Sequence, residues 1–261
     1  MQRSKNRRLK QNQTKGKKVN LIVFLILTLF VIGLTLVFWK VYSVEKFAFV
    51  NKGINGDAEI IIFDPSSDSI NVYVIPGSTL LVSSRSLGEY RLDNLWILGV
   101  KEGVGGKIIA ESISKNYSIP LYYWKDGVHT NLDLFKYLRS NLILKSPMLE
   151  KTVIESNKLS NSVLVNFVDN EVSELGIEIE IEDLTGNTNT ANEIGKILEI
   201  IGTKITSYSK GYNEDLDCEV IGANKKVIDI ISKELNCKSI INQGQNNVIQ
   251  LRLGAKFVSR F

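Results

Sequence analysis

The sequence contains few of the residues that bind transition metals or form a framework of disulfides. It has one histidine and two cysteines among 261 residues. A structural zinc site is excluded, because tetrahedral coordination by Cys and His needs four ligands. The composition is otherwise ordinary, with 44% apolar and 23% charged residues, which excludes collagen-like, low-complexity and disordered chains. The length allows one or two domains that each bury a core of their own.

Acidic residues are absent from the first eighteen positions, which hold eight lysines and arginines. Because the whole chain carries a net charge of +4 and this tail +8, the remainder carries −4. The segment 21–39 is a nineteen-residue apolar run, long enough as a helix to cross about 30 Å of hydrocarbon. Trp39 and Tyr42 lie at its far end, where aromatic residues typically meet the membrane interface. We therefore expect a basic tail over 1–18 and a transmembrane helix over 19–42.

The distribution of basic residues predicts the orientation of this helix. Under the positive-inside rule the tail lies in the cytoplasm, and the chain from about residue 44 onward lies outside the cytoplasmic membrane. A cleaved signal peptide is the alternative, but its apolar core is usually shorter and precedes a small-x-small site, whereas WKVYSVEKF follows here. A basic run can also bind nucleic acid, but beside a membrane it typically contacts anionic lipid headgroups. We expect a single-pass membrane protein with no nucleic-acid partner.

The region 55–150 has the pattern of an α/β domain. Two runs rich in β-branched residues, 58–65 and 70–76, are separated by the turn cluster SSDS and predict a hairpin or adjacent core strands. The glycine-rich GVGG precedes a helical stretch, and the strand-like run 117–124 precedes a helix over 131–140. Strands that alternate with helices favour an α/β layer, so we expect a three-layer-like α/β domain here.

Residues 155–162, ESNKLSNS, are polar and lack periodicity. We expect the region 151–176 around them to link this domain to a second one over 177–257, with the boundary anywhere from about 145 to 175. In the second domain GIEIEIEDL alternates with the period of a strand, and two later stretches have apolar residues at helical spacing. The element order, βαβ-βαβ-β, predicts a small α+β sheet with two helices on one face. We expect the last strand, over 248–253, to form an exposed edge of this sheet.

The two cysteines fall at positions that a disulfide can join. Cys218 lies in a predicted strand, and Cys237 lies near the start of the next parallel strand, after one helix. This placement brings their Cα atoms near the separation of roughly 4.4–6.8 Å that a disulfide requires. An extracytoplasmic location permits oxidation. The sequence leaves open whether the two form a bridge or remain free thiols, and a bridge would contribute stability rather than catalysis.

The order of these elements resembles a known family. DAEIIIFDPSSDSINVYVIPGSTLLV and the stretch from YRLDNLWILGV to NLDLFKYL are similar to the first half of the LytR-CpsA-Psr domain, over about 85 residues. In that domain a strand pair ends in Ile-Pro-Arg-Asp, a Gly-Gly helix follows, and an Ile-Asp-Tyr-Tyr-like strand leads to another helix. Residues 177–256 resemble the LytR C-terminal domain, with DLTG at 183–186 for its Asn-Gly-Thr-Gly-like turn and Leu253-Gly254 at the end of its final strand.

The resemblance implies an envelope phosphotransferase, which moves glycopolymers from a polyprenyl-pyrophosphate carrier to peptidoglycan with arginines, carboxylates and usually magnesium. Such chemistry needs cations around the pyrophosphate. This sequence departs from the pattern, because Gly77 and Ser78 stand where the family has Arg-Asp, and 140–176 contains no arginine. The residues that remain for ligand binding are Arg85, Arg91 and Asp93, with Arg139 as a further basic residue.

Other groups of residues are weaker candidates for a metal, catalytic or ligand-binding site. Carboxylates at 57, 59, 64 and 93 are candidate magnesium ligands, but Glu59 and Asp64 point to opposite faces if both lie in one regular strand. His129 is more consistent with a solvated loop than with a general base. The glycines at 103, 105 and 106 fail the phosphate-loop pattern at two positions, Lys101 and Ile108, and favour a tight helix entry. Stacking of Tyr122 and Trp124 on a sugar is the alternative to core packing.

The sequence therefore predicts a single-pass envelope protein whose outer part binds or acts as a scaffold without catalysis. The expected partners are wall glycan, a polyprenyl-linked polymer or another envelope protein, and no cofactor or metal is expected. A phosphotransferase is the alternative, with magnesium or a cation set rebuilt from Arg85 and Arg91. In that case, a basic, lipid-sized apolar cleft should converge on those residues. Transcriptional attenuation, which the family's older name suggests, has no DNA-reading motif here.

Overall fold

The computed structural model describes residues 24, 27–33, 46–64, 67, 69–126, 129–130, 149–154, 158–187, 189–244 and 247–261. It divides into two units, Met1–Val44 and Glu45–Phe261. In the first, Phe24 and residues 27–33 are helical, and their apolar side chains are exposed. The rest of the expected span and the basic tail lie outside the described residues. Within the described part of the chain, no helix combines the length and apolarity needed to cross a bilayer.

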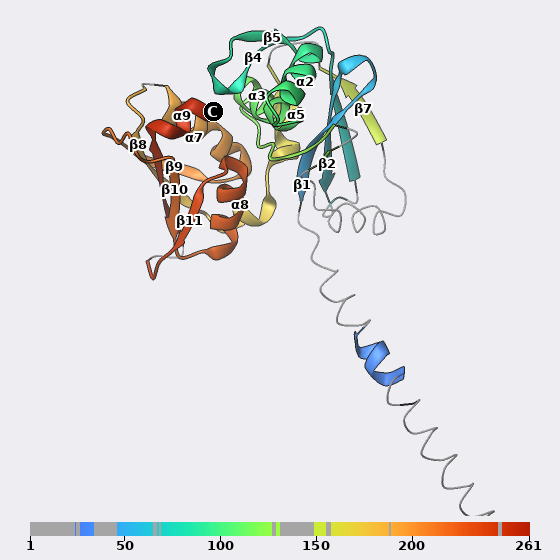
Figure 1. Ribbon diagram of the computed structural model, residues 1–261. Coiled ribbons are helices and arrows are strands. Elements are labelled where there is room, and N and C mark those ends of the chain that lie inside the picture. Colours follow the sequence, from blue (N-terminus) through green and yellow to red (C-terminus); the bar gives the residue numbers. More distant parts are fainter. Residues whose placement is uncertain are drawn as a thin grey trace, which may run out of the picture. The chain divides into compact units, whose positions relative to one another are not determined.

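The second unit is a mixed α/β structure that contains two five-stranded sheets (Figure 1). The first sheet has the strand order β6-β1-β2-β3-β7. Its central strands, β1 (Phe47–Lys52), β2 (Ala58–Asp64) and β3 (Ser69–Ile75), pair antiparallel. The outer strands, β6 (Tyr123–Lys125) and β7 (Leu149–Val153), pair parallel with β1 and β3. The expected hairpin between the two β-branched runs is thus confirmed.

Two helices cover one face of the first sheet. Helix α2 (Leu92–Lys101) and helix α3 (Lys107–Tyr117) bury their apolar stripes against the strands. Trp96 is 2% exposed, and its Nε1 donates a hydrogen bond to the carbonyl oxygen of Gly56 at 3.1 Å. That bond fastens the short 3-10 turn η1 (Ile54–Gly56), which joins β1 to β2. A small ribbon of β4 (Leu80–Val82) and β5 (Glu89–Arg91), with the 3-10 turn η2 (Ser84–Ser86) between them, leads into α2.

The opposite face of the first sheet is aromatic. Alternation along β1 and β2 places Phe47, Phe49 and Phe63 on this face, and the ring centroids of Phe47 and Phe63 are 5.0 Å apart. All three side chains are at most 6% exposed. The helix expected over 131–140 lies outside the described residues, so the three-layer expectation stays a prediction.

The strand-like run 117–124 forms a shorter strand than the sequence predicts. Helix α3 continues to Tyr117, and β6 begins at Tyr123. Pro120 has no N–H to give to a neighbouring strand. The backbone of Leu121 instead interacts with the carboxyl of Glu234 on α8 (Lys225–Leu235). The segment between helix and strand therefore faces the second half of the unit rather than pairing within the first sheet.

The region expected to link two domains contains short helices that pack against both sheets. These are α5 (Asn161–Leu164), the 3-10 turn η3 (Val165–Phe167) and α6 (Asn170–Glu174). Phe167 is buried in the core of the first sheet, and Val172 is buried in the core of the second. The segment thus fixes the two halves of the unit against each other.

The second sheet has the order β11-β10-β12-β8-β9. It is built from two βαβ units: β8 (Glu178–Leu184), α7 (Thr190–Ile201) and β9 (Lys204–Lys210), then β10 (Cys218–Gly222), α8 (Lys225–Leu235) and β11 (Lys238–Ile241). Strand β12 (Val248–Gly254) and helix α9 (Ala255–Arg260) end the chain. Both α7 and α8 pack on one face, as the element order predicts (Figure 1).

The expected exposed edge at 248–253 is wrong. Strand β12 lies in the middle of the sheet, antiparallel to β10 and parallel to β8. The chain returns from β11 across the sheet and fills the gap between the two βαβ units, which explains why Ile249, Leu251 and Leu253 are fully buried. The edges of this sheet are β9 and β11.

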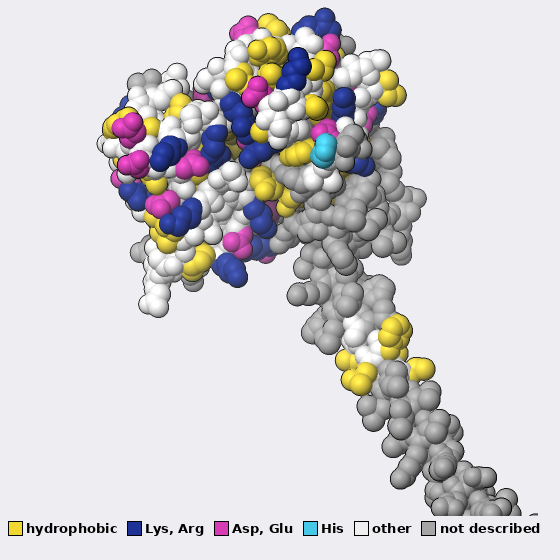
Figure 2. Space-filling view, viewed as in Figure 1, with side chains coloured by type: hydrophobic (Ala, Val, Ile, Leu, Met, Phe, Trp, Pro, Cys, Tyr) yellow, Lys and Arg dark blue, Asp and Glu magenta, His cyan; other side chains and the backbone are white. Residues whose placement is uncertain are grey.

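The face of the second sheet away from α7 and α8 is polar. Arg252 lies at its centre and forms ion pairs with Glu182 at 2.7 Å and Glu219 at 3.0 Å. In Figure 2, basic and acidic side chains lie interspersed over the visible side of this half of the unit. The visible surface of this half therefore carries charges of both signs and no continuous basic patch.

Candidate binding site

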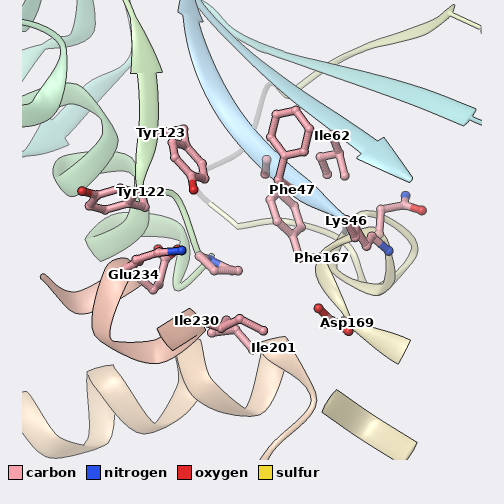
Figure 3. A pocket seen from close by; sticks show the side chains of 14 residues that line it. Lys46, Phe47, Ile62, Tyr122, Tyr123, Phe167, Asp169, Ile201, Ile230 and Glu234 are labelled. Carbon is pink, nitrogen blue, oxygen red and sulfur yellow. The ribbon is translucent and has the colours of Figure 1, made fainter. Parts of the chain in front are cut away.

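A pocket of about 110 Å³ lies between the two halves of the second unit (Figure 3). We call it the junction pocket. Its walls come from the start of β1, the segment before β6, the end of η3, the end of α7 and the end of α8. The volume is several times what one water needs, so the pocket is large enough for part of a small organic ligand. The fourteen residues that line it are Lys46, Phe47, Ala48, Ile62, Pro120, Tyr122, Tyr123, Asn166, Phe167, Asp169, Ile201, Ile230, Lys233 and Glu234.

Most of the lining is apolar or aromatic. Phe47 and Tyr123 meet edge to face with ring centroids 6.1 Å apart, and Tyr122 meets Tyr123 in the same way at 5.0 Å. The stick view places these rings above the opening and the isoleucines of α7 and α8 below it (Figure 3). Such a lining favours a ligand with an apolar face, held in orientation by a few polar groups.

The polar groups on one side of the pocket already have partners within the protein. Lys46 Nζ lies 2.9 Å from Asp64 Oδ2 and donates to the carbonyl oxygen of Val168 at 2.9 Å. Asp169 is the N-cap of α6 and accepts from two backbone N–H groups, those of residues 171 and 172. Asn166 donates to the hydroxyl of Tyr73 at 2.5 Å. These bonds fix the shape of the pocket, and the carboxylate of Asp64 compensates the charge of Lys46.

Glu234 supplies the most perturbed ionisable group of the pocket. Loss of hydration raises the pKa of this carboxyl from 4.5 to about 8, although the N–H of Leu121 donates to it and acts in the opposite direction. Glu234 is thus largely protonated at neutral pH. A protonated carboxyl both donates and accepts hydrogen bonds, so this group can bind a neutral polar atom of a ligand.

The residues that the sequence singles out for ligand binding lie elsewhere. Arg85, in η2, forms an ion pair with Glu111 of α3 at 3.2 Å. Arg91 Nη2 lies 2.7 Å from Asp93 Oδ2, at the start of α2. None of Arg85, Arg91 and Asp93 lines the junction pocket. The structure therefore does not bring these three residues to the pocket, and each arginine is paired with a carboxylate of the chain. Arg139 lies outside the described residues.

Position 77 has no room for a side chain. A Cβ atom on Gly77 would lie 2.8 Å from the carbonyl oxygen of Asn55 and 3.1 Å from two backbone atoms of Gly56. The N–H of Gly77 donates to Asp57 Oδ1 at 2.7 Å, and its carbonyl accepts from the N–H of Asp93 at 3.0 Å. The turn after β3 is thus packed directly on η1 through its backbone.

The candidate magnesium ligands Asp57, Glu59 and Asp64 bond to different groups of the protein. Asp57 accepts from Gly77, Glu59 pairs with Lys151 at 3.1 Å, and Asp64 pairs with Lys46. Over the described parts of the chain, no group of three or more His, Cys, Asp or Glu residues has the geometry to hold a metal. The odd spacing of Glu59 and Asp64 on β2 does place them apart, with Glu59 partly exposed and Asp64 buried.

The loop and glycine motifs have structural explanations. The side chain of His129 is 70% exposed, and its backbone N–H donates to Asp126 Oδ1. The indole of Trp124 lies against Gly105 and Gly106 at the entry to α3, where a Cβ would approach the ring to 2.9 and 2.7 Å. The glycines thus allow Trp124 to pack into the core. Tyr122, in contrast, lines the junction pocket.

The two cysteines form a disulfide, with their Cα atoms 5.0 Å apart. It joins the start of β10 to the residue that precedes β11, as the predicted strand and helix order requires. The bond lies away from the junction pocket.

No protein-family model, curated protein or solved structure matches the chain. The resemblance to the LytR-CpsA-Psr family therefore stays a prediction from the sequence.

Sequence reasoning missed the residues of the junction pocket, although one of them leaves a signal. Val227 and Ile231 define the buried stripe of α8, and helical spacing continues that stripe to position 234. A glutamate on an apolar stripe indicates a buried carboxyl. Lys46 and Asp169 leave no such signal, because only the packing of the two halves brings both to one pocket.

Proposed function

We propose that this chain is an envelope protein that binds a ligand at the outer face of the cytoplasmic membrane without transferring phosphoryl groups. In this proposal the segment 19–42 spans the membrane, with the basic tail in the cytoplasm. The part over 55–150 is a degenerate LytR-CpsA-Psr-like domain, and 177–257 is a LytR-type C-terminal domain. Ligand candidates are wall glycan, a polyprenyl-linked polymer and another envelope protein.

The observation that carries the proposal is the geometry after β3. The resemblance requires an arginine at position 77, but the backbone of η1 occupies the space that its side chain would need. An arginine there would force η1 away from Trp96, to which it is hydrogen-bonded. The tight packing of Gly77 on η1 therefore supports a site that lacks this arginine.

The pairing of Arg85 and Arg91 also argues against a pyrophosphate site. Arg85 and Arg91 are each neutralised by a carboxylate of the chain, so a pyrophosphate would have to compete with Glu111 or Asp93. The junction pocket lies apart from these arginines, and its lining includes none. A mostly apolar pocket without a cluster of cations favours binding over phosphoryl transfer.

Native mass spectrometry of the full chain in detergent, with a polyprenyl-pyrophosphate and with or without magnesium, tests the proposal. We expect no cleavage of the phosphate bond under either condition. Cleavage that depends on magnesium and is lost in Arg85→Gln or Arg91→Gln would contradict the proposal and support a phosphotransferase. Binding without cleavage that is lost in Ile230→Trp, which fills the junction pocket, would identify the polyprenyl-linked carrier as the ligand.

Topology is tested separately. Single cysteines, one in the tail and one at the exposed position Lys238, are introduced into a chain that lacks the native pair. In intact cells a membrane-impermeant maleimide should label the second and not the first. Labelling of the tail alone would show the opposite orientation. Release of the protein from washed membranes would contradict the predicted membrane anchor.

A further inference from the structure

The two sulfur atoms of the disulfide have different surroundings. Cys218 lies on β10 and is 3% exposed, whereas Cys237 follows α8 and is partly exposed. An external thiol therefore reaches Cys237 more easily than Cys218. Exchange at a disulfide depends on which sulfur is attacked and on the stability of the thiolate that leaves.

A guanidinium group lies against the buried sulfur. Arg260 Nη2 lies 3.0 Å from Cys218 Sγ and donates to the carbonyl oxygen of Asn236 at 3.0 Å. Its Nε lies 2.9 and 3.1 Å from the two carboxylate oxygens of Asp217. The guanidinium also stacks on the ring of Phe257, 4.7 Å from its centroid. These contacts hold the guanidinium, whose charge is balanced by Asp217, in place beside one sulfur of the pair.

This arrangement stabilises one product of exchange. A thiolate at Cys218 would accept a charge-assisted hydrogen bond from Arg260 Nη2, which stabilises the anion. A more stable thiolate is a better leaving group. Exposure of Cys237 and stabilisation of Cys218 thus act in the same direction, so the geometry favours attack at Cys237 and departure of Cys218.

We propose that the Cys218–Cys237 disulfide is a thiol-exchange site, at which an external thiolate attacks Cys237 and Cys218 leaves as a thiolate paired with Arg260. The new bond forms between the external sulfur and Cys237 Sγ, and the bond that breaks is the one between Cys237 and Cys218. Charge is conserved, because one thiolate replaces another. With a dithiol as co-reactant, its second thiol releases Cys237, so the dithiol is oxidised and the pair is reduced by two electrons. The inference is independent of the ligand of the junction pocket.

The test uses the full chain in detergent with glutathione as the thiol. Samples are quenched with N-ethylmaleimide over time, and peptide mass spectrometry locates the glutathione adduct. We expect the adduct at Cys237 in at least about tenfold excess over Cys218, with maleimide on Cys218 in the same molecules. An adduct found mainly on Cys218, equal adducts on both, or no adduct after hours of incubation would each overturn the proposal.

Arg260→Gln tests the role of the guanidinium. We expect exchange at Cys237 to slow by roughly three- to tenfold, because the departing thiolate loses its charge partner. Arg252→Gln is the matched control, since it removes an ion-paired arginine from the same sheet without touching the disulfide. Equal rates in the wild type and in Arg260→Gln would contradict the mechanism. Arg260→Lys keeps the charge and should retain most of the rate, which separates this effect from any loosening of α9.

Discussion

At the scale of single residues, the clearest departure from an ordinary protein interior is Glu234. Its carboxyl has a pKa raised to about 8 because burial between the two halves of the unit removes its hydration. In the unfolded chain the group ionises near 4.5. The folded state therefore binds more protons than the unfolded state between these two values, so stability falls as the pH rises through this window.

Glu234→Gln should remove this pH dependence. The amide keeps an acceptor for the N–H of Leu121 but cannot ionise. We expect the variant and the wild type to have similar free energies of unfolding near pH 4.5, and the variant to be more stable by at least about 1 kcal/mol at pH 8.5, since a tenfold change in proton affinity corresponds to about 1.4 kcal/mol. Urea titrations at several pH values measure the difference. Parallel stability curves for the two proteins across this range would contradict the raised pKa.

Gly77 lies where the backbone of η1 leaves no room for a side chain. We expect Gly77→Ala to lower the free energy of unfolding by about 1–3 kcal/mol, because its Cβ would press against backbone atoms of η1 that cannot rotate away. Ser78→Ala, one residue along and exposed, is the control and should change stability by less than about 0.5 kcal/mol. Thermal unfolding of both variants is the measurement. A neutral Gly77→Ala would mean that η1 can move and that an arginine is sterically possible at this position.

At the scale of elements, the sequence predicts most of the regular structure and misses what depends on distant contacts. Alternation and helical spacing locate β2, β3, α7 and α8 closely, because these elements bury a periodic stripe of their own. Strand β1 is missed because its alternating faces are both buried, one by α2 and α3. The turns over 158–175 are short, and polar residues separate their buried side chains, Val163, Phe167 and Val172, so no periodic stripe predicts their packing.

Helix caps offer a test at this scale. Asn224 is the N-cap of α8, and its side-chain oxygen accepts from the N–H of Val227 at 3.3 Å. Asn189 occupies the same position at the start of α7 but makes no side-chain cap bond. We expect Asn224→Ala to cost about 1 kcal/mol of stability, and Asn189→Ala to cost less than half of that. Chemical denaturation of the two variants compares them directly, and equal losses would show that the bond to Val227 has no stabilising effect.

At the scale of the whole molecule, the junction pocket exists because two sheets that the sequence presents as separate domains pack into one unit. The segment over 158–175 carries this packing. The N–H of Asp169 donates to the carbonyl oxygen of Ile201 at the end of α7, and Asn166 reaches Tyr73 on β3. Lys46 meets the same segment through Val168. No local sequence pattern predicts these contacts, because each joins residues far apart in the chain. Sequence motifs therefore cannot predict a pocket that these contacts form.

The same contacts predict that the two halves unfold together, with Phe167 as the coupling residue. Phe167 is buried at 6% in the core of the first sheet and lines the pocket beside Ile201, whereas Val165 on the same turn is 61% exposed. We expect Phe167→Ala to cost about 3–5 kcal/mol and to separate the unfolding of the halves, while Val165→Ala leaves one transition.

The measurement uses two probes in a Trp39→Phe background. Tryptophan fluorescence then reports Trp96 and Trp124, which both belong to the first half, and far-UV circular dichroism reports both halves. In the parent the two curves should coincide, which is the mark of a two-state transition. In Phe167→Ala they should diverge, because the core of the first sheet loses a side chain that the second half holds in place. Divergence already in the parent would mean that the halves are independent domains, and the junction pocket would then be a contact between domains that can open.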